Sequence, residues 1–199
     1  MAITIKGRGS GGDAVMAPRS RSVLAIQDGT VKATALEAGK FFPQTTGGHS
    51  DPAFHEDTPN SAPPADGKIA SAGNPGAAQL DRTDIEWAKH QVVSGEVLDV
   101  TWSFTVLRTV RRFNYFLTNA DWDPTLPLAR SQFEDKPFYT VENTQRPFWN
   151  YQSELAAQSP TTHSIPLPQR TDYQVLLAVC EIADTGTALY QVIDLSFDS

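Results

Sequence analysis

The chain has 199 residues, of which 40% are hydrophobic and 20% are charged, and its formal net charge is -7. This length and composition suit a single domain with its own core, which we expect to span residues 13–199. The acidic balance argues against nucleic acid as a partner, because a protein that binds phosphate backbones needs a basic face. The single cysteine, Cys180, excludes an intrachain disulfide and a cysteine-based metal site.

The first segment, residues 1–12, is rich in glycine and serine, and we expect it to be flexible. It has no apolar stretch of the kind that a secretory signal requires, and no run elsewhere is long enough to span a bilayer. We therefore expect a soluble protein without a membrane span that is cytoplasmic or released by a non-classical route.

From Leu36 to Gly76 the chain is rich in Gly, Pro, Ser, Asp and Asn and shows no sustained periodicity, which predicts long loops with short helical turns. This region contains His49 and His55, close to three acidic residues, and such side chains can hold zinc or copper. Their spacing matches no defined metal motif, so a solvated polar loop is the favoured interpretation and we expect no metal or other cofactor.

The second half predicts strands. In Leu98–Val106 apolar and polar residues alternate, as in a strand with one buried face, and Trp102 and Phe104 are expected to supply core. Turn residues separate this segment from further predicted strands at Phe113–Thr118, Tyr173–Ile182 and Leu189–Phe197. Several short strands joined by turns indicate an all-β antiparallel sandwich.

Residues 64–73, with the sequence PADGKIASAG, resemble the signature loop of the chitin-binding type-4 proteins, the bacterial and viral lytic polysaccharide monooxygenases. Further blocks resemble the same family in the same order along the chain: Val15–Arg21, Trp87–Lys89, Phe113–Thr118, Trp122–Pro124, His163–Arg170, Glu181–Thr185 and Leu189–Asp194. The resemblance implies a fibronectin III- or immunoglobulin-like sandwich, with a long loop-rich insertion containing short helices after the first strand.

In that family two histidines, one of them the N-terminal residue, clamp a copper ion that oxidatively cleaves chitin or cellulose. Counted from the block that begins at Pro18, the first histidine position falls at Gly12 and the second at Arg108. The axial aromatic position falls at Leu189, and the buried tryptophan near the copper falls at Cys180. A guanidinium offers only donors and cannot ligate copper, so these replacements imply that the redox centre has been lost.

No other catalytic constellation is visible, so we expect no catalytic residues. The serines lack the context of a nucleophile elbow, no glycine-rich phosphate loop precedes a helix, and Cys180 falls in an apolar strand where a thiol is usually inert. A glycosidase needs two carboxylates facing across a cleft, which a sequence with many acidic residues cannot single out.

Several residues are candidates for binding. Arg108, expected near the former copper face with Arg21, Arg111 and Arg112, needs a carboxylate or carbonyl partner if it is buried. For Arg111 and Arg112 we favour salt-bridged surface positions.

Aromatic residues are the second group of candidates. Phe41 or Phe42 could stack on a pyranose ring, since a flat apolar ring suits its C–H face. Trp149 and Tyr151 belong to an aromatic loop that forms either a contact surface or a small core clipping the loop to the sheet.

The favoured function is therefore non-catalytic recognition of chitin, of a related N-acetylglucosamine polymer, or of a protein partner, on a monooxygenase-like scaffold without the copper site. Two alternatives remain open. One is a copper-dependent polysaccharide monooxygenase with an unrecognised metal site, and the other is a toxin or virulence component that acts on a host chitin layer or receptor.

Overall fold

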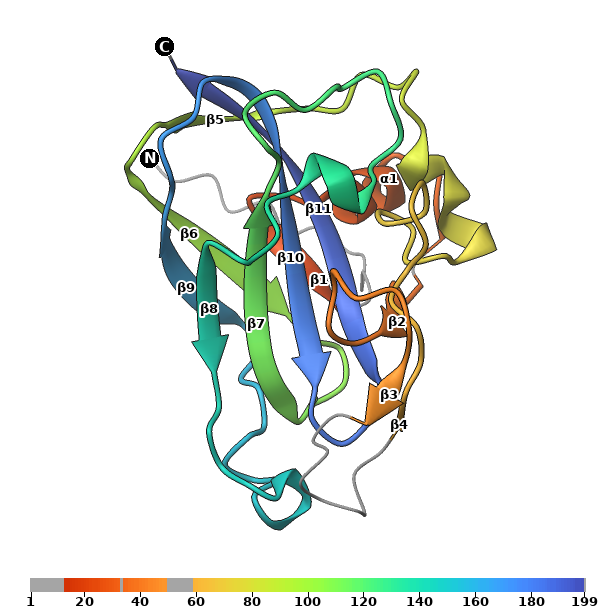
Figure 1. The fold of residues 1–199 in the computed structure, drawn as a ribbon, viewed down its shortest axis with the longest axis vertical. Helices are drawn as coiled ribbons and strands as arrows, with labels where there is room; N and C mark the ends of the chain where they lie inside the picture. The colour runs from red at the N-terminus through yellow and green to blue at the C-terminus, as the bar shows by residue number, and fades with distance from the viewer. Residues whose placement is uncertain (1–12, 33, 50–58, 199) are drawn as a thin grey trace.

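Two β-sheets lie face to face in the computed structural model (Figure 1), which describes residues 13–32, 34–49 and 59–198. The predicted flexible segment 1–12, with Gly12, and His55 lie outside the described residues. The smaller sheet is antiparallel and contains, in spatial order, β1 (Ala14–Ala17), β6 (Val97–Ser103) and β9 (Thr161–Pro166).

The larger sheet has β10 and β11 at its centre. Its spatial order is β2 (Glu37–Gly39), β11 (Thr187–Asp198), β10 (Asp172–Ile182), β7 (Val110–Leu117) and β8 (Tyr139–Glu142). These neighbours pair antiparallel, whereas β5 (His90–Val93) pairs parallel to the end of β11. A separate two-stranded ribbon is formed by β3 (Gly48–His49) and β4 (Pro59–Asn60). The predicted sandwich is thus confirmed, with one parallel pairing that the sequence did not indicate.

The space between the two sheets is filled by the first hydrophobic core. Trp102 is fully buried and Phe104 is 7% exposed, and their rings stack in parallel with centroids 5.9 Å apart. Phe113 of β7 lies against both rings. The prediction that Trp102 and Phe104 supply core is confirmed, because the alternation in this strand does follow the buried face.

A second core lies on the outer face of the larger sheet. Helix α1 (Arg21–Gln27), the loop-rich region and the 3-10 helix η1 (Pro75–Asp81) cover this face, and Leu36, Ile69 and Leu80 pack there. Since both faces of β10 are buried, its residues alternate between the two cores, and Val175 to Cys180 forms an unbroken apolar run.

The predicted boundaries need two corrections. The first strand ends at Ala17, so Arg21 lies at the start of α1 and not on a strand. The alternating strand ends at Ser103, and Val106 is 61% exposed in the connection to β7. The remaining helices are single 3-10 turns, η2 (Arg130–Gln132) and η3 (Phe148–Asn150). In the described ranges, no helix combines the length and apolarity needed to cross a membrane.

The loop-rich region is held tightly against the edge of the larger sheet at β2. A Cβ atom added to Gly39 would lie 1.6 Å from the carbonyl oxygen of Ser61, so only glycine permits this approach. The backbone N–H of Gly39 donates a hydrogen bond to Ala62 O at 3.0 Å. This contact fixes β2, which carries Glu37 toward the site described below.

Candidate functional site at the Arg108 end of the sandwich

Arg108 lies in the connection between β6 and β7 and forms an ion pair with Asp13. Its Nε atom is 2.8 Å from Asp13 Oδ2, and its Nη2 atom is 3.7 Å from Glu37 Oε2. The backbone N–H and the hydroxyl of Thr105 donate hydrogen bonds to Asp13 Oδ1 at 2.6 and 2.8 Å. Both oxygens of this buried carboxylate are therefore engaged, and the expected acidic partner of Arg108 is Asp13.

The electrostatics of this pair keep both groups charged. Burial raises the pKa of the Asp13 carboxyl, but the hydrogen bonds from Arg108 and Thr105 lower it by more, so the pKa lies below its ordinary value. Burial lowers the pKa of Arg108, and its hydrogen bond to Asp13 and the nearby Glu37 outweigh this effect, so the net shift is upward. The pair is consequently ionised throughout the neutral range.

The positions that the resemblance assigns to the copper site converge on this ion pair. Cys180 of β10 and Leu189 of β11 face each other across the ladder, and Leu189 is also opposite Glu37 of β2. Cys180 is fully buried and interacts electrostatically with Arg108. Three of the four assigned positions thus lie together, and the fourth, Gly12, lies outside the described residues but directly precedes Asp13.

The side chains described at this position do not fit a copper ion. Arg108 is a cation without a lone pair, and the Asp13 carboxylate is already bound to Arg108 and Thr105. Burial raises the pKa of the Cys180 thiol well above its ordinary value, which keeps it protonated and a poor ligand. Within residues 13–32, 34–49 and 59–198, no group of three or more histidine, cysteine, aspartate or glutamate side chains is arranged to hold a metal.

Next to this site, a buried glutamate organises the neighbouring arginines. Glu181 is fully buried, and its Oε2 atom is 2.6 Å from Nε of Arg112 and 3.9 Å from Nε of Arg111. Burial raises the pKa of Glu181, and the nearby cations oppose this shift. The predicted salt bridges of Arg111 and Arg112 are confirmed, although Arg111 is buried and not a surface residue.

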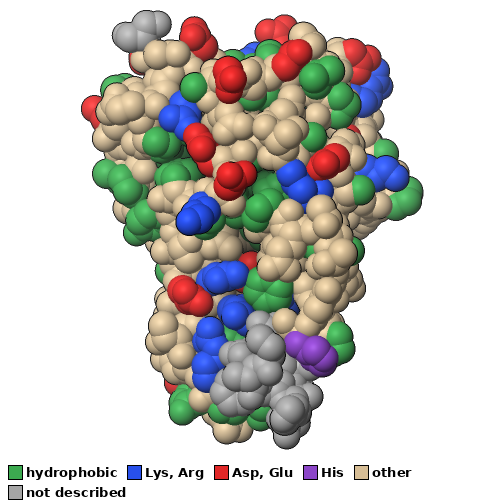
Figure 2. All heavy atoms as spheres, viewed as in Figure 1, with side chains coloured by type: hydrophobic (Ala, Val, Ile, Leu, Met, Phe, Trp, Pro, Cys, Tyr) green, Lys and Arg blue, Asp and Glu red, His purple; other side chains and the backbone are tan. Residues whose placement is uncertain are grey.

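Charges divide unevenly over the molecular surface. Figure 2 shows Asp and Glu side chains mostly in the upper half of the view, whereas Lys and Arg side chains occur in both halves, with one group in the lower centre.

The predicted stacking platform requires a correction. Phe42 is only 4% exposed, and its ring packs edge-on against Phe116, Phe133 and Tyr190 in the second core. It is unavailable to a polysaccharide, because the insertion folds back onto the sheet. Phe41 is half-buried at φ 68°, and the guanidinium groups of Arg111 and Arg112 lie 5.0 and 5.4 Å from its ring centroid.

The aromatic loop around η3 combines the two roles that the sequence left open. Phe148 and Leu155 are buried with Ala183, and Tyr151 packs against them, so a small core does clip the loop to the sheet. Trp149 is 37% exposed at the surface. The loop continues alongside the Arg108 segment, because the N–H of Ala157 donates to Arg108 O at 2.8 Å.

Sequence reasoning missed the most exposed apolar residues at this end. Val106 and Leu107, directly before Arg108, are 61% and 74% exposed. The alternation of the preceding strand extends to Val106, which is why the sequence predicts that Val106 lies on the buried face. The signal that could have revealed an exposed tip is the pair of consecutive apolar residues before an arginine.

Arg21 does not belong to this end of the molecule. Its Nε and Nη2 atoms form a bidentate pair with Asp194, at 2.8 and 2.7 Å, and it is only 5% exposed. Asp194 of β11 pairs with Val175, close to the first residues of β10, whereas Leu189 of β11 pairs with Cys180 near the other end of β10. The expectation that Arg21 accompanies Arg108 is wrong, because the chain turns into α1 after β1.

The described histidines, His49, His90 and His163, lie in three different surroundings. His163 Nδ1 lies 2.7 Å from the hydroxyl of Tyr115, and its ring packs edge-on against Phe113. His90 Nε2 lies 3.0 Å from the carbonyl oxygen of Arg19. His49 is exposed on β3.

A family model described as lytic polysaccharide mono-oxygenase, cellulose-degrading, matches residues 14–195. The chain therefore belongs to the lytic polysaccharide mono-oxygenase family. GlcNAc-binding protein A of Vibrio campbellii is 38% identical over 136 residues, which are 68% of this chain and 26% of that protein. GlcNAc-binding protein A of Shewanella oneidensis is 34% identical over 189 residues, 93% of this chain and 35% of that protein.

Among solved structures, a chitin binding domain from Burkholderia pseudomallei superimposes with a TM-score of 0.88 and 41% identity, covering 94% of this chain and 99% of the other. An AA10 lytic polysaccharide monooxygenase from Streptomyces lividans has a TM-score of 0.74 and 28% identity, with 93% and 99% covered. The chain spans between 26% and 35% of the length of the two curated relatives.

Proposed function

We propose that this protein binds chitin or a related N-acetylglucosamine polymer through the Arg108 end of the sandwich, and that it does so without copper catalysis. The observation that carries the proposal is the ion pair between Arg108 and Asp13. Arg108, a cation, stands at one of the two positions that the resemblance assigns to copper-ligating histidines, and its partner Asp13 directly follows the other position, Gly12. A non-catalytic role leaves the polysaccharide-binding function of such a scaffold intact.

The nature of the polymer is supported by the similar proteins. The relatives from Vibrio and Shewanella are named GlcNAc-binding proteins, and the Burkholderia structure is described as a chitin binding domain. The strong structural similarity over nearly the whole chain makes a shared class of ligand the simplest expectation.

The surface at this end has the chemistry that a polysaccharide requires. Val106, Leu107 and Trp149 offer apolar contact to the C–H faces of pyranose rings. Beside them, Arg108 and Glu37 are 21% and 27% exposed, so their polar edges can meet acetamide or hydroxyl groups. We therefore assign the contact to the Val106–Arg108 tip and the exposed Trp149, in place of the buried Phe42.

The test is retention on insoluble chitin and on cellulose by the parent protein and by the double variant V106S/L107S. We expect the parent to be retained on chitin and the variant to lose about 1–3 kcal/mol of binding free energy, since apolar contact is removed from an exposed tip. The melting temperature should stay near that of the parent.

The control is V97S, which changes another exposed valine, 62% accessible, on β6 and away from the tip. It should be retained like the parent. If the double variant binds chitin as strongly as the parent, the tip is not the contact surface. If no protein is retained, the proposal of polysaccharide binding fails and a protein partner at Trp149 becomes the better hypothesis.

The absence of copper catalysis needs its own experiment. Calorimetric titration of the chain with Cu(II) should show no stoichiometric tight site, because Arg108 and the engaged Asp13 supply no available ligand. Chitin incubated with the protein, a reductant and peroxide should yield no oxidised oligosaccharides. Tight stoichiometric binding together with oxidised products would establish the alternative, a copper-dependent polysaccharide monooxygenase.

A further inference from the structure

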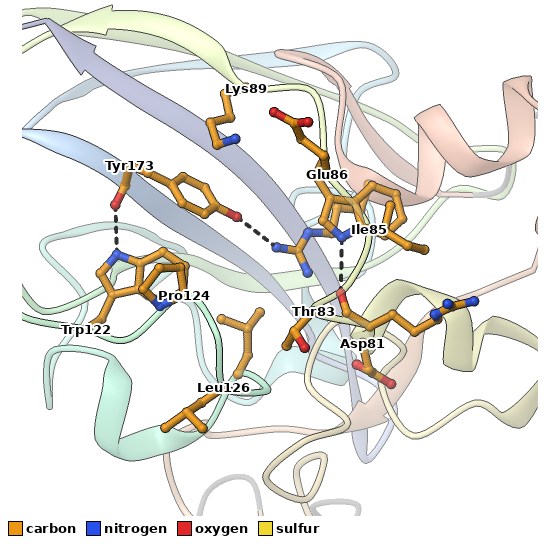
Figure 3. A pocket seen from close by; sticks show the side chains of 13 residues that line it. Asp81, Thr83, Ile85, Glu86, Lys89, Trp122, Pro124, Leu126 and Tyr173 are labelled. Atoms are coloured by element: carbon orange, nitrogen blue, oxygen red, sulfur yellow. Dashed lines mark hydrogen bonds between the residues drawn. The ribbon is translucent and has the colours of Figure 1, made fainter.

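A polar cavity lies at the other end of the larger sheet, around the first residues of β10. Its floor is formed by Arg21 and Tyr173, and its walls come from the connection between η1 and β5 and from the loop after β7 (Figure 3). Tyr173 and Cys180 are seven residues apart on β10, which corresponds to roughly 23 Å in an extended strand. The cavity is therefore separate from the Arg108 end.

The floor of the cavity is rigid. Arg21 is held by Asp194 in a bidentate pair, donates to Leu80 O at 3.1 Å, and lies 5.1 Å from the ring centroid of Trp87. The Tyr173 hydroxyl donates to Asp194 Oδ1 at 2.6 Å and accepts a hydrogen bond from Arg21 Nη2 at 3.3 Å. These contacts fix the polar groups before any ligand arrives, which reduces the entropy cost of binding.

Aromatic rings form the walls. Two of the four tryptophans in the chain, Trp87 and Trp122, line this one cavity together with Tyr173. Trp122 packs edge-on against Tyr173 with centroids 5.0 Å apart, and its Nε1 atom donates to Tyr173 O at 2.8 Å. Figure 3 shows Leu126 and Pro124 near Trp122, and all three line the cavity.

Polar groups of both signs surround the rim. Lys89 lies over the ring of Tyr173, with Nζ 4.7 Å from its centroid, and Glu86 is exposed beside it. Asp81 is half-buried on the opposite side. Because Arg21 is neutralised by Asp194 and Arg82 by Asp84, the cavity offers donors and acceptors without a strong net charge.

The volume of the cavity limits the size of the ligand. It measures about 180 Å³. A protein cavity of roughly 150 Å³ accommodates benzene, so this one has room for about one six-membered ring. A ring with hydroxyl groups matches the rim, because each hydroxyl both donates and accepts hydrogen bonds, and its C–H face matches the tryptophan wall.

We propose that the cavity lined by Trp87, Trp122 and Tyr173 binds one neutral pyranose ring, as a free monosaccharide or the terminal residue of a chain. This site does not depend on the Arg108 end. A neutral ring is favoured over a charged small molecule because the cations on the floor and rim already have carboxylate or aromatic partners.

The experiment is a titration of the intact chain with N-acetylglucosamine and with glucose, followed by tryptophan fluorescence and by backbone amide shifts. We expect saturable changes in the millimolar range, because a ligand of this size gains little binding free energy. The shifting amides should lie at residues 81–89 and 122–126. L-phenylalanine and glycerol serve as comparison ligands and should not saturate.

The variant E86A/K89A removes the rim groups and should weaken sugar binding by about tenfold, as expected for the loss of charged hydrogen-bonding partners. D135A/K136A removes the same types of charge from exposed positions elsewhere and should bind like the parent. Both variants should be retained on chitin like the parent, which separates this proposal from the function of the Arg108 end.

Three results would overturn the proposal. One is the absence of any saturable change with either sugar, and another is unchanged sugar affinity in E86A/K89A. The third is saturation by phenylalanine but not by the sugars, which would mean that the cavity takes an aromatic side chain.

Discussion

Arg108 and Asp13 depend on each other at the end of the sandwich. Asp13 has a side chain only 2% exposed, so it requires the guanidinium and the two donors of Thr105 to remain charged. Arg108 is 21% exposed and retains contact with water and with Glu37. The two partners are therefore unequally buried. Loss of Arg108, which leaves the buried Asp13 without its counter-charge, should destabilise the protein more than loss of Asp13.

We expect R108M to destabilise the protein by about 1–3 kcal/mol, because Asp13 then loses its counter-charge while remaining buried. D13N should cost less, since Arg108 can turn toward Glu37 and solvent. The double variant D13N/R108M should recover part of the loss. Urea denaturation of all three variants measures these differences. If the losses of unfolding free energy in the two single variants add up to the loss in the double variant, the pair is not energetically coupled.

Three strands are connected by one chain of hydrogen bonds through the first core. Trp102 of β6 donates from Nε1 to the hydroxyl of Tyr115 on β7 at 3.1 Å, and that hydroxyl lies 2.7 Å from Nδ1 of His163 on β9. An indole N–H is only a donor, so the Tyr115 oxygen accepts from Trp102, and the Tyr115 hydroxyl proton is available to His163 whenever Nδ1 carries a lone pair. The neutral imidazole with its lone pair on Nδ1 completes this chain, and burial favours the neutral form by lowering the pKa of His163.

This chain predicts a pH dependence of stability. Burial lowers the pKa of His163 below its ordinary value of 6.5, so the unfolded protein binds this proton more readily than the folded protein. The contribution to stability is present above the unfolded pKa and is lost as pH falls through the folded pKa. Urea midpoints measured between about pH 5 and about pH 8 should decline on the acid side.

The control is H163N, whose side-chain oxygen can accept the Tyr115 proton but does not titrate. Its stability should change less than that of the parent on the acid side. An identical decline in both proteins would assign the effect to other groups.

At the scale of the whole molecule, the larger sheet separates two cores and connects two distant polar regions. β10 carries Cys180 beneath the Arg108 end and Tyr173 at the floor of the cavity lined by Trp87 and Trp122. Acidic side chains lie mostly in the upper half of the face seen in Figure 2, whereas basic side chains occur in both halves. The two proposals therefore concern opposite ends of the larger sheet, the polymer at the Arg108 end and a single sugar ring at the Tyr173 end.

Much of the fold and part of the site could be predicted because they depend on local patterns. Alternation located Trp102 and Phe104 in the core, and the apolar run ending at Cys180 predicted a strand, which proved to be buried on both faces. The ordered blocks of family resemblance placed Arg108, Leu189 and Cys180 near one another. Because a buried cation needs a partner, the sequence also predicted that Arg108 would meet a carboxylate or a carbonyl oxygen.

The sequence by itself therefore determined the sandwich, its core residues and the chemical unsuitability of Arg108 as a metal ligand, because these follow from periodicity and side-chain chemistry. Only the tertiary structure decided that Phe42 is buried, that Arg21 lies at the far end, that Val106 is exposed and that Asp13 is the partner of Arg108. These outcomes depend on how a long loop folds back over a sheet and where a strand ends. Contacts between residues far apart in the chain leave no periodic signal in it.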